Sequence, residues 1–184
     1  MRIELLTLGK LEPAINPIIP ERITAIIPSS TCTLSSTRLS LPNEAYHSER
    51  DQYHSDEVLH TIRTYARENE VAHRILGITD VDLYTSNLNF VFGQAESPGR
   101  TALISRHRLK PQFYGHPVQP HLLRERTVKE AVHELGHTLG LRHCPHPSCV
   151  MHFSNSIVET DEKQALFCTS CHNNLLEKVN TSGR

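Results

Sequence analysis

The chain has 184 residues, of which 38% are hydrophobic and 21% charged, so it is long enough for one soluble domain with a proper core. Its 19 Lys and Arg residues balance 20 Asp and Glu residues, which excludes a strongly basic protein that binds nucleic acid or an anionic membrane. The start MRIELLTLGK is too short and polar for a signal peptide, and no run reaches the ~18 apolar residues of a membrane helix. We therefore expect a cytoplasmic protein with reduced cysteines.

Two strands are predicted in the first third of the chain. The first covers residues 2–8, which alternate as a strand does. The second covers residues 22–27 and is stopped by Pro28. Residues 29–53 are rich in Ser, Thr and turn-forming residues, so we expect a long connection over the surface there.

A helix and three further strands are predicted in the middle of the chain. Ser55 is a predicted N-cap of a helix over residues 56–68. The core side of that helix has helical spacing and consists of Val58, Leu59, Ile62 and Ala66. Strands are expected over residues 75–84, 88–96 and 101–109. This order of elements indicates an α/β layer with a mixed sheet.

Two more helices are predicted after these strands, which makes about three in all. One covers residues 124–139 and ends at Gly140, a residue suited to the left-handed position after a helix. The other begins near Thr160, with Asp161 and Glu162 in its first turn. One face of it carries Cys168, Cys171, Leu175 and Val179. We find no repeat or second domain, so we expect a single domain over residues 1–184.

Three histidines follow one another at fixed spacing in HELGHTLGLRH. His133 and His137 lie four residues apart, so on a helix both imidazoles point the same way and can bind one Zn²⁺ ion. Gly140 breaks the helix, and the turned chain can return His143 to the same ion. Three protein nitrogens leave one position open for water, which is typical of catalytic zinc.

Glu134 follows the first of these histidines directly. It lies about 100° around the helix, so we predict that it hydrogen-bonds a water on the metal rather than binding the metal itself. The alternative is that the histidines are surface residues of an ordinary amphipathic helix. That alternative requires the five residues of the pattern to coincide by chance, which we consider the weaker interpretation.

Four of the five cysteines form two short pairs, Cys144 with Cys149 and Cys168 with Cys171. Four thiolates suit a tetrahedral structural zinc with no open position, and such a site would clamp the chain after the last histidine to the final helix. Disulfides, an iron–sulfur cluster and unrelated reduced thiols are the alternatives. Cys32 has no partner in this scheme and is expected to be a plain thiol.

The pattern HExxHxxGxxH is the long zinc-binding motif of the metzincin metallopeptidases. With the two cysteine pairs and Met151 behind it, the chain resembles the archaemetzincin family. The stretches LPNEAYHSERDQY and ILGITDVDLYTSNLNFVFGQA agree, so the resemblance covers most of the chain. It implies a metzincin-like fold with a twisted, mostly parallel five-stranded sheet and one antiparallel edge strand. It also implies a catalytic zinc on His133, His137 and His143, and a structural zinc on Cys144, Cys149, Cys168 and Cys171.

Several other residues near these motifs are candidates for supporting roles. Met151 is expected to pack as a floor beneath the metal-binding histidines. Phe153 stands where some other metzincins have a tyrosine that reaches the metal, so no phenol assists here. Asp80 and Asp82 could hydrogen-bond a histidine Nδ1, but a structural role at strand ends is favoured. Three more histidines are expected to be solvated or to support a ligand by hydrogen bonding, rather than to bind metal themselves: His146, His152 and His172.

From these residues we predict zinc-dependent peptide-bond hydrolysis, with Glu134 as general base. An extended peptide or protein substrate could pair with an exposed edge strand at Leu88 to Gln94. The main alternative is a zinc-binding protein that keeps the peptidase fold but acts by binding peptides or proteins. The near-neutral charge disfavours a nucleic-acid-binding zinc finger. We expect a monomer that carries two zinc ions.

Overall fold

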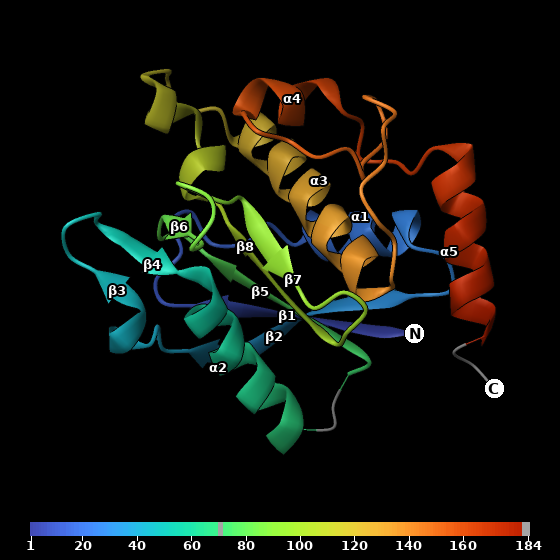
Figure 1. The fold of residues 1–184 in the computed structure, drawn as a ribbon, viewed down its shortest axis with the longest axis horizontal. Coiled ribbons are helices and arrows are strands. Elements are labelled where there is room, and N and C mark those ends of the chain that lie inside the picture. Colours follow the sequence, from blue (N-terminus) through green and yellow to red (C-terminus); the bar gives the residue numbers. More distant parts are fainter. Residues whose placement is uncertain (70–71, 182–184) are drawn as a thin grey trace.

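Five strands form the central sheet of the computed structural model, which describes residues 1–69 and 72–181 (Figure 1). They are β1 (Arg2–Leu8), β2 (Thr31–Leu39), β5 (Arg74–Thr79), β7 (Gly93–Ala95) and β8 (Thr101–Ser105). Their order is β2-β1-β5-β8-β7, and every pair is parallel except β7 with β8. The expected α/β fold, with a mixed five-stranded sheet and one antiparallel edge strand, is confirmed.

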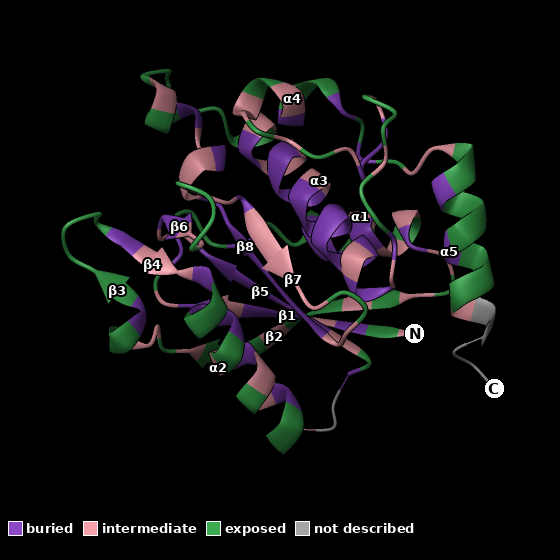
Figure 2. Ribbon diagram, viewed as in Figure 1, coloured by how far each residue is buried: buried purple, intermediate pink, exposed green. Residues whose placement is uncertain are grey.

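Helices cover both faces of this sheet (Figure 1). α1 (Ile18–Ile26) and α3 (Pro120–Thr138) pack on one face, and α2 (Ser55–Glu68) packs on the other. Strand side chains alternate between the two cores, so Leu5 of β1 joins the core under α1 and α3 while Leu6 joins the core under α2. Because α3 is buried along most of its length (Figure 2), it holds the side chains of the HELGH motif on a rigid element.

Two further helices and a small second sheet complete the described part of the chain. The helices are α4 (Ile157–Glu162) and α5 (Thr169–Thr181), so residues 1–69 and 72–181 contain five α-helices where about three were predicted. The second sheet consists of β3 (Tyr46–His47), β4 (Gln52–His54) and β6 (Leu83–Tyr84). Short 3-10 helices lie at Asn43–Ala45, His107–Leu109 and Pro111–Tyr114. Within the described residues, we find no helix with the length and apolar character needed to cross a bilayer.

Two predictions for the segment between β1 and α2 are wrong. Residues 22–27 were predicted as a strand but belong largely to α1, in which Ile19 and Ile23 lie one turn apart and are both buried. Residues 29–53 were predicted as a connection but contain β2, an edge strand that pairs only with β1. The residues of β2 are exposed or half-buried, so its Ser and Thr content resembles that of a loop.

The three strands predicted in the middle of the chain are shorter than expected. The strand predicted over residues 75–84 is interrupted between β5 and β6, where Asp80 leaves the ladder and its carboxylate pairs with the Arg106 guanidinium at 2.8 Å. Of residues 88–96 only Gly93–Ala95 are strand, and of residues 101–109 only Thr101–Ser105. At the end of β5, the ion pair of Asp80 therefore marks the boundary of the strand.

The predicted starts of α2 and α3 are displaced by a few residues. α2 includes Ser55 as its first residue, and His54 occupies the N-cap position predicted for Ser55. α3 begins at Pro120 rather than at residue 124. Proline is tolerated at the first helical position, because the N–H groups of the first turn have no acceptor within the helix.

The single helix predicted from Thr160 is in fact two helices. α4 begins after Ser156, whose side chain and that of Glu159 form a capping box, so Asp161 and Glu162 lie in its last turn rather than in a first one. The chain then runs without helix until α5 begins at Thr169. This break lets the second cysteine pair approach the first.

Candidate functional site

His133 and His137 project from α3 with their ring orientations fixed by main-chain carbonyls. His133 Nδ1 lies 2.7 Å from the Val150 oxygen, and His137 Nδ1 lies 2.8 Å from the Leu141 oxygen. A carbonyl only accepts hydrogen bonds, so each Nδ1 carries the proton and each Nε2 presents a lone pair. The two Nε2 atoms are 3.1 Å apart.

The end of α3 brings His143 back toward these rings. Gly140 has φ +81°, which few residues other than glycine adopt. The Leu141 N–H donates to the Gly136 oxygen at 3.0 Å, and the Gly140 N–H donates to the His137 oxygen at 2.8 Å. This Schellman pattern reverses the chain, and His143 Nε2 comes to 3.2 Å from His137 Nε2.

The chemistry of these three histidines fits a divalent cation. Their ligand nitrogens all lie within 4.8 Å of one another. Nitrogens bound tetrahedrally to zinc at 2.0–2.1 Å are about 3.3 Å apart, close to the separations of the Nε2 atoms. Lone pairs that face one another at such distances repel unless a cation lies between them. Burial lowers the pKa of His133, His137 and His143, which keeps the rings neutral and available as ligands.

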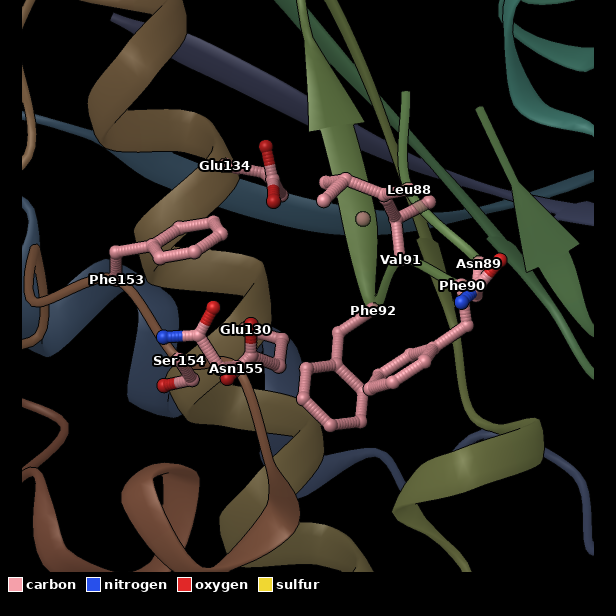
Figure 3. A pocket seen from close by; sticks show the side chains of 11 residues that line it. Leu88, Asn89, Phe90, Val91, Phe92, Glu130, Glu134, Phe153, Ser154 and Asn155 are labelled. Atoms are coloured by element: carbon pink, nitrogen blue, oxygen red, sulfur yellow. The ribbon is translucent and has the colours of Figure 1, made fainter. Parts of the chain in front are cut away.

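Glu134 lies beside the histidines but faces a different space. It is buried and lines a cavity of about 230 Å³ together with Glu130, Phe153 and the segment Leu88–Gly93. Figure 3 shows its side chain pointing from α3 toward this cavity. Burial raises the pKa of Glu134 well above its usual value, and the nearby Glu130 carboxylate raises it further.

Gly93 on β7 is a functional residue that the sequence analysis missed. A Cβ at this position would lie 2.7 Å from Glu134 Cγ, from Glu134 Oε1 and from the Leu103 oxygen. Only glycine therefore lets the edge strand lie directly against the Glu134 carboxylate. The available signal was a glycine inside a predicted strand, which often marks a close approach of the backbone to another group.

Replacing Gly93 by Ala is expected to displace the Glu134 carboxylate and to lower kcat on a peptide substrate by at least tenfold, because a small misplacement of a catalytic group has such effects. Zinc bound per chain should stay the same, since Gly93 does not contact the histidines. An unchanged kcat in the Gly93 variant would show that the Glu134 position does not depend on this approach.

Met151 packs directly against α3 within the histidine motif. It is fully buried, and a Cβ at Gly136 would lie 2.5 Å from Met151 Sδ. Gly136 lies between His133 and His137 in the sequence, so the methionine contacts the helix within the motif, and its role as a floor beneath the rings stays a prediction. Gly136 was not singled out, although a glycine in a helix interior costs about 1 kcal/mol and usually has a packing reason.

The four cysteines of the two pairs also converge. Their sulfurs lie within 4.8 Å of one another, and Cys144 Sγ is 3.8 Å from Cys168 Sγ. Thiolates bound tetrahedrally to zinc at 2.3 Å are about 3.8 Å apart, whereas disulfide sulfurs are bonded at about 2.05 Å. All five cysteines of the chain are free, Cys32 included, although Cys32 lies in β2 rather than in a connection.

Main-chain N–H groups donate to the sulfurs of this cluster. The Cys168 N–H donates to Cys149 Sγ at 3.3 Å, and the His146 N–H donates to Cys144 Sγ at 3.5 Å. The Cys171 N–H lowers the pKa of the Cys168 thiol to about 7, while burial raises the pKa of Cys149 and Cys171. The thiols of Cys149 and Cys171 resist ionisation in the absence of a metal, but a bound cation stabilises their thiolates. This set of donors therefore also fits a metal.

A buried ion pair supports the cavity wall and was not foreseen. Lys163 Nζ lies 2.9 Å from Glu130 Oε1, with side chains 0% and 4% exposed. The same ammonium is 3.5 Å from the His152 oxygen. The pair therefore ties the residue after α4 to α3, one turn before Glu134, and holds the chain around Phe153. Nothing in the sequence distinguishes Lys163 from an exposed lysine.

The remaining candidates lie outside the two ligand groups found in residues 1–69 and 72–181. Asp80 pairs with Arg106 and Lys110, and Asp82 pairs with Arg108, so both aspartates act at strand ends. The Phe153 ring centroid lies 4.9 Å from that of His143. His146, His152 and His172 belong to neither ligand group.

A carboxylate and two imidazoles on one helix, with a third imidazole returned to them by the chain after it, form the arrangement of zinc metallopeptidases. Comparison with known proteins agrees and is more specific. The sequence model of peptidase family M54 matches residues 15–178, and the chain belongs to that family, the archaemetzincins. The resemblance stated from the sequence is thereby confirmed.

Relatives and solved structures match most of the chain. The archaemetzincin of Pyrococcus furiosus is 47% identical over 146 residues, which are 79% of this chain and 76% of that protein. The crystal structure of archaemetzincin from Methanopyrus kandleri has a TM-score of 0.86 at 38% identity and covers 98% of this chain and 96% of its own. A zinc-dependent peptidase from Methanocorpusculum labreanum has a TM-score of 0.85 at 29% identity, with 94% and 99% covered.

Proposed function

We propose that the chain hydrolyses peptide bonds, with zinc held by His133, His137 and His143 and with Glu134 as general base. The observation that carries this proposal is the convergence of three histidine Nε2 atoms beside a buried carboxylate that faces a cavity. When bound, zinc supplies Lewis acidity, which polarises the scissile carbonyl and lowers the pKa of water in the site.

Glu134 moves the proton in this mechanism. Its carboxylate takes a proton from the attacking water and gives it to the leaving nitrogen as the peptide bond breaks. Burial, which raises the pKa of Glu134, suits a group that must both accept and donate a proton. Because Glu134 lines the cavity beside Leu88–Gly93, the amine half of the substrate lies on that side of the histidines.

The edge strand β7 is the proposed docking strand for an extended substrate. Residues Leu88–Gly93 lead into it beside Glu134, and Ala95 and Ser97 follow beside His137 and His143. A peptide with its amine half on the Glu134 side therefore runs antiparallel to β7. Only part of the predicted stretch Leu88 to Gln94 is strand. Its first residues therefore line the cavity rather than form main-chain hydrogen bonds with the substrate.

We further propose that Cys144, Cys149, Cys168 and Cys171 hold a second, structural zinc. Four thiols kept for a metal require a reducing compartment, which is consistent with the predicted cytoplasmic location. A single domain, a monomeric state and the absence of nucleic-acid and membrane partners stay predictions from the sequence.

A digest of a diverse peptide library tests the proposed activity. The zinc-loaded chain should cleave library peptides, a chelator should abolish cleavage, and added zinc should restore it. Mass spectrometry of the products identifies the cleaved bonds. Binding of peptides by the zinc-loaded chain without any cleavage would refute the hydrolase and favour the alternative of a peptide-binding zinc protein.

A further inference from the structure

A second hollow is lined by two of the three histidines and not by Glu134. It has a volume of about 470 Å³ and is lined by Ala95, Ser97, His137, Arg142 and His143. Arg142 is exposed. Its guanidinium makes no hydrogen bond or ion pair with any residue of the described ranges 1–69 and 72–181. A positive charge without a partner therefore faces the space in which a substrate would lie.

The position of Arg142 is fixed by its neighbours rather than by its own side chain. On one side the Leu141 N–H donates to the Gly136 oxygen at 3.0 Å. On the other side the Cys144 N–H donates to the Met151 oxygen at 2.9 Å. The guanidinium thus extends from a backbone anchored at both ends and directly precedes the third histidine.

The edge segment beside this hollow offers Arg142 no free carboxylate. The acidic residue of the adjacent edge segment is Glu96, which pairs with Arg63 at 2.7 Å and accepts from Thr101 Oγ1 at 2.8 Å. Its carboxylate is therefore already engaged.

The two sides of the histidines thus differ in their polar groups. The cavity on one side is lined by Glu134 and by Glu130, which pairs with Lys163, and the hollow on the other side is lined by the unpaired Arg142. If the amine half of the substrate lies beside Glu134, as the proposed function requires, the acyl half passes Arg142.

We propose that Arg142 is a specificity-determining residue that selects peptides with an aspartate or glutamate among the last few residues before the cleaved bond. This inference rests on the proposed function for the direction of the substrate. An exposed ion pair of this kind contributes an affinity difference of about three- to fivefold between a carboxylate and its amide. The preference should weaken at high salt, because the pair is open to solvent.

The test measures binding, so it does not depend on turnover. Peptides that differ only in Glu against Gln, placed in the half expected to pass Arg142, are titrated into the zinc-loaded Glu134→Gln chain. Each is titrated again into the same chain with Arg142→Gln or Arg142→Glu. Arg67→Glu, at an exposed position of α2, is the matched control for net charge. Zinc content is measured for every variant, because Arg142 adjoins a proposed ligand.

We expect the Glu peptide to bind about three- to fivefold more tightly than the Gln peptide in the parent and in the Arg67 variant. This ratio should fall to about one with Arg142→Gln and below one with Arg142→Glu, in which the two carboxylates repel each other. An unchanged ratio with Arg142→Gln at full zinc content would overturn the inference. So would a library digest in which acidic residues are enriched only after the cleaved bond. Absence of cleavage by the wild-type chain would refute the proposed hydrolase, but the ratio of the Glu and Gln peptide affinities could still be measured.

Discussion

Replacing Glu134 by Gln is expected to leave zinc bound at the histidines and to lower kcat by about 10²–10⁴-fold, the usual contribution of a general base. The amide has nearly the same size as the carboxylate, so the cavity beside Gly93 should keep its shape. It cannot take a proton from water or return one to the leaving nitrogen. Metal analysis together with kcat on a peptide identified in the library digest measures both effects.

The matched control for this variant is Glu21→Gln, the same chemical change at an exposed position of α1. It should retain both the zinc and the activity of the wild-type chain. Activity of Glu134→Gln equal to that of the control would refute the assignment of Glu134 as general base. Loss of zinc from Glu134→Gln would instead show that Glu134 supports the metal site.

The features of the candidate site that the sequence predicted are those encoded over short distances. His133, Glu134 and His137 lie on one helix, so their relative directions follow from helix geometry alone. Gly140 and His143 follow His137 closely in the sequence, at the end of the same motif. The four cysteines fall into two short pairs, and only the approach of one pair to the other depends on the tertiary fold.

The residues that the sequence analysis missed act over long distances in the chain. Gly93 contacts Glu134 from another element, and Lys163 meets Glu130 only because α4 folds back over α3. No local pattern in the sequence encodes either contact. The same limit explains the error at α1, where β-branched isoleucines favour a strand but packing against α3 stabilises a helix.

The two proposed metal sites share one short segment of backbone. Cys149 contributes its sulfur to the cysteine cluster. The next residue, Val150, provides the carbonyl that orients His133, and Met151 packs against Gly136 between the helix-borne histidines. The Cys144 N–H also donates to the Met151 oxygen at 2.9 Å, beside His143. A metal that orders the cysteines therefore also orders the histidines, whereas the reverse dependence is weak, because α3 is held by its own core.

This asymmetry predicts that substitutions in the two sites have different effects on zinc binding and on stability. The wild-type chain should bind two zinc ions, and His137→Ala should bind one with little loss of stability. Cys168→Ser should lose the structural zinc and also weaken the remaining site by about 10–100-fold, as loss of supporting contacts does. Because binding of a structural zinc contributes directly to folding, its Tm should fall by roughly 10 °C or more.

Cys32→Ser is the matched control for the cysteine variant, since Cys32 lies in β2 outside both ligand groups. It should keep two zinc ions and a Tm close to that of the wild-type chain. Metal analysis, zinc titration with a competing chelator and thermal unfolding measure the three quantities. Equal zinc content and Tm in the Cys168 and Cys32 variants would contradict the structural site. Loss of both zinc ions from His137→Ala would reverse the proposed dependence, because the histidines would then order the cysteines.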